Sequence, residues 1–163
     1  MSRSFGFGDR LSVIGDRKKK ECGMRSEKKW GAEDLDVFKR AYELSLQLHR
    51  VSLDFPKTEQ FSGLADQLRR ASKSVCGLIV EGVGRQAGSP KEFARYLTMA
   101  LGSAEETKLW LRYSRDLDYI KAEQAEIWRE EISRVIRMLQ GLKSSLGKER
   151  HSSSDHRLPI TDH

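Results

Sequence analysis

The sequence has few of the residues on which disulfide frameworks, metal centres and membrane spans depend. Its 163 residues include two cysteines, three prolines and four histidines, and they contain no CxxC pair and no zinc-like Cys/His spacing. No run approaches the roughly 20 apolar residues of a membrane-spanning helix, and the N-terminus lacks the apolar run of a signal peptide. These absences favour a protein of the reducing cytoplasm without a membrane partner.

Patterns typical of catalysis are also missing. His49 is the only histidine of the predicted helical region, and no Glu stands three residues before it, as di-metal bundles require. Gly82 and Gly84 lack the continuation of a phosphate-binding loop. Cys76 lies in an apolar stretch and is interpreted as a core residue rather than a nucleophile. We predict no catalytic residue, no metal and no cofactor, and hence a protein that binds or assembles rather than an enzyme.

Charge is abundant and unevenly distributed. The formal net charge is +6, and residues 1–30 alone hold nine basic and four acidic side chains. Residues 31–147 hold 18 basic and 17 acidic side chains, and residues 148–163 hold three of each. A basic chain attracts polyanions such as nucleic acid, but a pI near 9.4 is also compatible with mere solubility. Composition alone leaves both interpretations open.

Three regions are predicted along the chain. Residues 1–30 are rich in Gly, Ser, Lys and Arg without helical or strand periodicity, and they are predicted to form a disordered basic arm. Alternatively, Met24 is the natural start and the residues before it are not translated. Residues 31–147 are predicted to form one helical domain, and residues 148–163 are predicted to form a disordered polar tail.

Apolar residues of the central region recur at steps of three and four, the period of helices in a bundle, and no segment alternates like a strand. Helices are predicted at about residues 33–52, 60–85, 90–115 and 121–146. Short connections between helices of similar length favour an all-α, antiparallel up-down four-helix bundle.

Local signals mark several helix ends. Ser89, Pro90 and Glu92 have the spacing of a capping box with proline at the first helical position. Gly147 stands where a C-terminal cap belongs, and Phe55 before Pro56 ends the first helix.

The second predicted helix carries the candidate binding residues. Arg69 and Arg70 are neighbours about 100° apart on the helix surface, and Lys73 is one turn beyond Arg69. The planar guanidinium group suits phosphate, but these side chains could equally be solvated or paired with acids such as Asp66 and Glu105.

Two acids are interpreted as structural. Glu81 stands next to the inward-facing Gly82, where a carboxylate needs a partner, and Arg85 is four residues away. Glu105 on the third helix is a further partner for the arginines of the second. We therefore predict that Glu81 and Glu105 form ion pairs that set helix register or subunit geometry.

Four aromatic residues of the third and fourth helices and of the turn between them complete the candidates. They are predicted to pack in the core or, alternatively, to form a subunit or nucleic-acid stacking surface. They are Trp110, Tyr113, Tyr119 and Trp128.

Many short motifs between residues 35 and 146 occur together in one known family. They are Leu35-Asp36-Val37-Phe38, Ala41-Tyr42, Phe55-Pro56, Gly63-Leu64, Gln67-Leu68-Arg69-Arg70-Ala71-Ser72, Ser74-Val75, Glu81-Gly82, Gly84-Arg85, Lys91-Glu92-Phe93, Tyr96-Leu97, Ala100, Gly102-Ser103-Ala104, Glu105, Leu139 and Gly141-Leu142. By these motifs the chain resembles the four helix bundle protein family. The family includes proteins encoded in intervening sequences of bacterial large-subunit ribosomal RNA genes and accessory variability proteins of diversity-generating retroelements.

The resemblance implies a homopentamer of four-helix protomers with a basic surface. In the retroelement branch it also implies binding to nucleic acid and to a reverse transcriptase. The family pattern Pro-x-Asn-Ile-Ala-Glu-Gly is altered here, because Cys76, Leu78 and Val80 replace its Pro, Asn and Ala.

Together these observations predict a non-enzymatic, oligomeric protein that binds RNA or DNA and assists a reverse transcriptase. The alternatives are a ribosomal intervening-sequence protein and an adaptor that acts only through protein contacts. The residues predicted to contact nucleic acid are Arg69, Arg70, Lys73 and Arg85, followed by Arg112 and Arg115.

Overall fold

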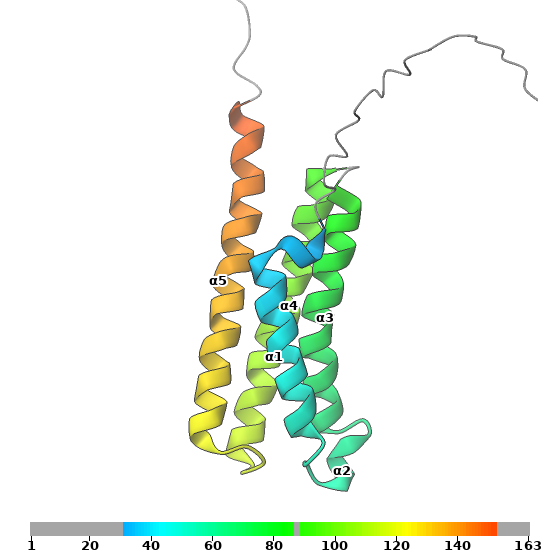
Figure 1. Ribbon diagram of the computed structural model, residues 1–163, viewed down its shortest axis with the longest axis vertical. Coiled ribbons are helices and arrows are strands. Elements are labelled where there is room, and N and C mark those ends of the chain that lie inside the picture. The colour runs from blue at the N-terminus through cyan, green and yellow to red at the C-terminus, as the bar shows by residue number, and fades with distance from the viewer. Residues whose placement is uncertain (1–30, 87–88, 153–163) are drawn as a thin grey trace, which may run out of the picture.

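Four long helices account for most of the chain that the structure describes, which is residues 31–86 and 89–152 of a computed structural model (Figure 1). A 3-10 turn, η1 (Ala32–Asp34), precedes the first long helix. A short helix of one turn, α2 (Lys57–Gln60), precedes the second long helix. Within the described residues there is no strand, so the predicted all-α fold is confirmed. The predicted basic arm and the part of the predicted tail after Ser152 lie outside the described residues. The long helices are α1 (Asp36–Ser52), α3 (Leu64–Gln86), α4 (Pro90–Asp116) and α5 (Ala122–Ser152).

The helices alternate in direction and form an antiparallel bundle. Helix α1 lies between α3 and α5, while α4 packs against α3 and α5 on the opposite side (Figure 1). Each long helix contributes apolar side chains to a single core. The largest fully buried side chains are Phe93, Leu48, Leu68, Ile79, Leu97, Leu111, Ile132 and Leu139.

The second predicted helix is divided in the structure. Helix α2 ends at Gln60, and α3 begins only at Leu64. Between them Ser62 adopts a left-handed φ of 60°, which interrupts the helix. Gly63 follows, and a Cβ atom there would lie 2.6 Å from the Cα of Glu59, so the tight approach of the two segments requires glycine.

The predicted cap of α4 is confirmed in its position but not in its side-chain hydrogen bond, and the predicted cap of the last helix is wrong. Ser89 is the N-cap of α4 and Pro90 is its first residue, but the Ser89 side chain makes no capping hydrogen bond. The Ser89 carbonyl instead accepts the backbone N–H groups of Glu92 and Phe93. Gly147 does not end the last helix, because α5 continues through it to Ser152.

The faces of the helices agree with the predicted apolar stripes except at two residues. Ile127 and Tyr42 both stand at the helical spacing of the apolar residues, but Ile127 is 58% exposed and Tyr42 is 50% exposed. In α1 the buried face passes instead through Ala41, Leu44 and Leu48. A shift of one residue turns a side chain about 100° around the helix axis, which places Tyr42 at the edge of the bundle.

Candidate nucleic-acid interface

The predicted phosphate-binding residues do not form one continuous surface. Arg69 and Arg85 are sixteen residues apart on α3, which corresponds to about 24 Å along the axis and about 160° around it. Arg112 and Arg115 lie on a different helix, α4. The structure therefore divides the candidates into three groups.

Arg69 binds neutral oxygen atoms where α1, α2 and α3 meet. Its Nη1 donates to Gln60 Oε1 at 3.0 Å and to Ser52 Oγ at 3.3 Å, and its Nη2 donates to the Gln60 carbonyl at 2.6 Å. Among the described residues no carboxylate forms an ion pair with Arg69. The guanidinium group therefore fixes this junction while its positive charge is not neutralised by an acid.

The next two cations extend the same side of α3. Arg70 is largely exposed and is 3.9 Å from Asp66, a weak contact within one turn. Lys73 is exposed and makes no hydrogen bond or ion pair with any described residue. We call Arg69, Arg70 and Lys73 the basic corner.

His49 on α1 faces the basic corner and was not predicted to take part in it. Its Nδ1 atom is buried and has no hydrogen-bond partner among the described residues. Partial burial lowers the pKa of His49 below its usual value, and the positive charges of Lys73 and Arg69 lower the pKa further. The imidazole is thus held neutral beside two cations.

The remaining candidates behave differently. Arg85 is exposed and has no partner within the described part of the chain. Arg115 donates to Asp116 Oδ1 at 2.9 and 2.7 Å, and the Arg112 Nε atom is 3.6 Å from Asp116 Oδ2. Since one carboxylate serves both arginines of α4, these two are weaker candidates for phosphate than the basic corner.

The predicted structural ion pairs do not form between the helices of this protomer. Glu81 is exposed on α3 and pairs with no basic side chain of the described residues. Glu105 is 3.8 Å from Lys108, a neighbour on its own helix, and contacts none of the arginines of α3. The prediction placed Glu81 inward because it precedes Gly82, but that single step turns it away from the core.

Most of the aromatic candidates are structural. Trp128 is buried and donates from Nε1 to Gln47 Oε1 at 2.8 Å. Tyr119 packs on Phe55, with 5.3 Å between ring centroids. Tyr113 lies beside Trp110 and is half-exposed, so it alone of the four presents a substantial surface to solvent.

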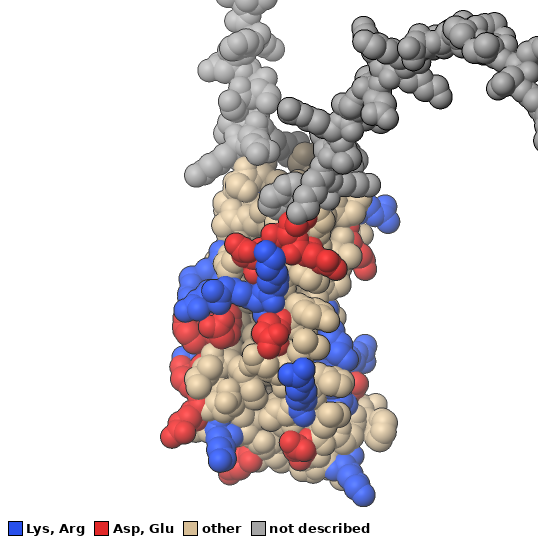
Figure 2. Space-filling model, viewed as in Figure 1, with Lys and Arg blue, Asp and Glu red and all other residues tan. Residues whose placement is uncertain are grey.

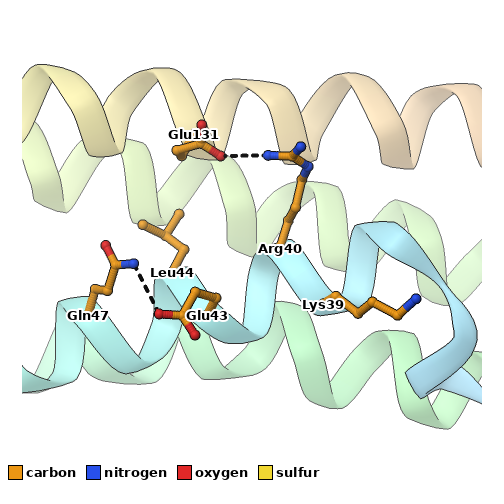
Figure 3. Close-up of a pocket in the computed structure, with 6 residues that line it drawn as sticks. All are labelled: Lys39, Arg40, Glu43, Leu44, Gln47 and Glu131. Atoms are coloured by element: carbon orange, nitrogen blue, oxygen red, sulfur yellow. Dashed lines mark hydrogen bonds and ion pairs between the residues drawn. The ribbon is translucent and has the colours of Figure 1, made fainter.

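A groove of about 300 Å³ runs between α1 and α5, but its charges are compensated. Figure 3 shows Arg40 and Glu131 pointing toward one another across it, with 3.1 Å between Arg40 Nη1 and Glu131 Oε2. Lys39 pairs with Asp36 at 3.1 Å. Positive and negative side chains are also interspersed over the face shown in Figure 2, without a continuous basic area. This groove is therefore a poor site for a polyanion.

The described residues contain neither a metal-holding group of side chains nor a membrane-spanning helix. No three His, Cys, Asp or Glu side chains of these residues are grouped so that they could hold a metal ion. None of the helices described is long and apolar enough to cross a membrane.

Comparison with known proteins identifies the family. The model of the family described as "23S rRNA-intervening sequence protein" matches residues 33–141, about two thirds of the chain. A crystal structure of a protein of unknown function, from the S23 ribosomal protein family of Bacteroides thetaiotaomicron, has a TM-score of 0.59 and 23% identity. The match covers 66% of this chain and 95% of that chain, and it shows the fold alone. No curated protein matches significantly.

These matches support the ribosomal branch of the resemblance and give no support to the retroelement branch. The family model spans most of the bundle, from just before α1 to the later turns of α5. The chain therefore belongs to the 23S rRNA-intervening sequence protein family.

Proposed function

We propose that this protein is a non-enzymatic nucleic-acid-binding protein that contacts the phosphates of RNA or DNA at the basic corner. The observation that carries the proposal is the state of Arg69, which is partly buried, held by three hydrogen bonds to neutral acceptors and not paired with a carboxylate of the described residues. Its geometry is fixed in advance, so little side-chain freedom would be lost on binding an anion.

The neighbours of Arg69 support the same proposal. Lys73 has no partner among the described residues, and Arg70 is held only loosely by Asp66. Three positive charges thus lie within two turns of one helix. Phosphate contacts of this kind give affinity without sequence specificity and make binding steeply dependent on salt.

The test compares two variants that remove the same charge from different places. Arg70→Gln/Lys73→Gln removes two cations of the basic corner, and Arg112→Gln/Arg115→Gln removes two cations already paired with Asp116. Arg69 is left intact because its hydrogen bonds hold the junction of α1, α2 and α3. Binding of a structured RNA and a duplex DNA is measured by fluorescence anisotropy across a salt series.

We expect the basic-corner variant to bind both nucleic acids roughly tenfold more weakly, with a salt slope smaller by about 1 for each lost phosphate contact. The α4 variant should bind nearly as well as the wild type. If both variants lose the same affinity for nucleic acid, binding is driven by the net charge of the chain, which residues 1–30 supply in large part, and the basic corner is not a specific site. No binding by the wild type at moderate salt would refute the proposal.

A second function, assembly through protein contacts, is supported by the outer face of α4. Three half-exposed apolar side chains lie on the outer side of α4, and a fourth lies at its C-cap: Met99, Leu109 and Tyr113 on the helix, and Leu117 at the cap. We infer that this face joins copies of the chain into an oligomer, or receives a protein partner such as a reverse transcriptase.

Light scattering of Leu109→Lys/Tyr113→Lys should show a smaller mass than the wild type, whereas Ile127→Lys on α5, also an exposed apolar position, should not change the mass.

A further inference from the structure

Phe61 is the most exposed large apolar side chain of the described residues. It lies between α2 and α3 and is 88% exposed, well above the 59% of Leu53 and the 58% of Ile127. Burial of such a ring would stabilise a protein, because apolar surface favours removal from water. A single exposed apolar side chain is ordinary on a protein surface, so the case for a ligand at Phe61 depends on what surrounds the ring.

The backbone that carries Phe61 is tightly held. The Gln60 Nε2 atom donates to the carbonyls of Ser52, Leu53 and Phe55 at 2.8, 3.2 and 2.9 Å. Arg69 donates to both the side-chain and the main-chain oxygen of Gln60. The residue immediately before Phe61 is thus fixed by five hydrogen bonds.

The chain after Phe61 is equally constrained. The backbone N–H of Leu64 donates to Glu59 Oε2 at 2.7 Å, and the Gly63 carbonyl accepts from Gln67 N at 3.0 Å. Gly63 lies too close to Glu59 to accommodate a side chain without displacement. The ring of Phe61 is consequently presented from a rigid turn and not from a loose loop.

The same arginine that holds this turn belongs to the basic corner. Arg69 bonds to Gln60, the residue before the exposed ring, and Arg70 and Lys73 follow within the first three turns of α3. Lys57, exposed on α2, adds a positive charge four residues before Phe61 in the sequence. Aromatic rings beside a row of cations are the arrangement by which proteins bind unpaired nucleic-acid strands, because every base has a face that can stack.

We propose that Phe61 stacks on an unpaired base of a single-stranded nucleic acid whose phosphates bind at the basic corner. The inference rests on the function proposed above and narrows its ligand from nucleic acid in general to single strands. The bases of a duplex are already stacked on one another, so a duplex cannot use Phe61 unless it opens. The protein should therefore prefer single strands of RNA or DNA over a duplex of the same length.

The experiment uses the full chain with fluorescein-labelled probes of about 12 nucleotides: oligo-uridine, oligo-deoxythymidine and an RNA duplex. Phe61→Ser removes the ring, and Phe61→Trp retains an aromatic face on which a base can stack. Leu53→Ser is the control, because it removes a nearby exposed apolar side chain that has no aromatic face. Dissociation constants are measured by anisotropy over a salt series. Thermal unfolding checks that each variant folds like the wild type.

We expect Phe61→Ser to weaken binding of both single strands about tenfold, the scale of one stacked base, while duplex binding and the salt slopes stay unchanged. Phe61→Trp and Leu53→Ser should keep wild-type affinity. The oligo-uridine and oligo-deoxythymidine probes differ both in the sugar and in the methyl group of the base, and equal affinity for them would show that neither is distinguished.

Two results would overturn the inference. In the first, Phe61→Ser binds single strands as well as the wild type does, while Arg70→Gln/Lys73→Gln weakens binding; the basic corner then stands and stacking is refuted. In the second, Phe61→Ser weakens single-strand and duplex binding equally. A wild-type protein that binds none of the probes refutes both the stacking and the function on which it rests.

Discussion

The interface between α3 and α4 and the interface between α1 and α5 solve the same packing problem in opposite ways. At the first, Gly82 lets two helices approach so closely that an added Cβ would lie 2.9 Å from the Phe93 ring and from Tyr96 Cβ. At the second, the helices leave a groove, and polar side chains span it. One interface depends on small residues and the other on long ones.

The difference shows where the fold is specified and where it can vary. Close-packed interiors tolerate neither added nor removed volume. Interactions between exposed polar groups contribute little individually and are screened by salt. We therefore expect substitutions at the α3–α4 interface to change stability more than substitutions at the α1–α5 groove.

Gly82→Ala should give the largest effect. The added methyl group meets a fully buried ring and the Cβ of Tyr96, which is attached directly to the helix backbone and cannot rotate away. Such overpacking costs roughly 1–3 kcal/mol, against a gain in helix propensity of up to about 1 kcal/mol. Urea unfolding of the wild type and the variant measures the net loss.

Gly77→Ala is the matched control on the same helix. Apart from the surrounding turns of α3 itself, no atom lies within 4 Å of a Cβ at Gly77, so only the propensity term remains and the variant should be more stable by about 0.5–1 kcal/mol. If Gly82→Ala and Gly77→Ala change the free energy of unfolding in the same direction, close packing at Gly82 does not limit stability. The contrast between the α3–α4 interface and the α1–α5 groove then fails.

Gln47→Leu tests the polar groove and should have a smaller effect. The substitution removes the acceptor of the hydrogen bond from Trp128 Nε1, which crosses from α5 to α1. A buried donor left unpaired costs about 1 kcal/mol or more, but the groove beside it opens to solvent and can offset part of that loss. We expect a loss of about 1 kcal/mol in urea unfolding.

Glu43→Gln serves as its control. Glu43 accepts a hydrogen bond from Gln47 Nε2 at 3.2 Å on the exposed side of the groove, and the Trp128 bond does not depend on it. The change in stability should stay within about 0.5 kcal/mol. A larger loss than that of Gln47→Leu would mean that the exposed contact, and not the Trp128 bond, holds the groove together.

The two interfaces also differ in how far the sequence predicts them. Leu68, Val75 and Phe93 are buried and follow the spacing of three and four, because a helix that buries one face repeats apolar residues at that period. The inward position of Gly82 follows from the same pattern, but the closeness of the two helices there does not. Helix α3 could therefore be placed in the bundle before its structure was known.

Contacts that depend on a turn could not be predicted in this way. Arg69 binds Gln60 because the chain breaks at Ser62, and nothing in the helical periodicity of residues 60–85 indicates that break. The exposure of Phe61 depends on the same break. The pairing of Arg112 and Arg115 with Asp116 was missed for a different reason: charged residues one turn apart have several possible partners, and only coordinates select among them.

The opposite side of α1 supplies the smallest predicted effect. The side of α1 that faces the groove carries paired polar groups. The side that faces α3 carries His49, which lies near the charges of Lys73 and Arg69 and whose buried Nδ1 has no hydrogen-bond partner among the described residues. Because the pKa of His49 is lowered in the folded state, the unfolded chain binds a proton more readily. The contribution of His49 is thus favourable above its unfolded pKa of about 6.5 and is lost as the pH falls below that value.

We therefore expect the stability of the wild type to fall more steeply between about pH 7.5 and about pH 5.5 than that of His49→Gln, which has no group titrating there. Urea unfolding at closely spaced pH values measures the two slopes, and histidines elsewhere in the chain cancel in the difference. Lys73→Gln should reduce the slope in part, since it removes one of the two charges that lower the pKa of His49. Parallel stability curves for the wild type and His49→Gln would show that His49 titrates alike in the folded and unfolded chains, and that the two sides of α1 do not differ in this respect.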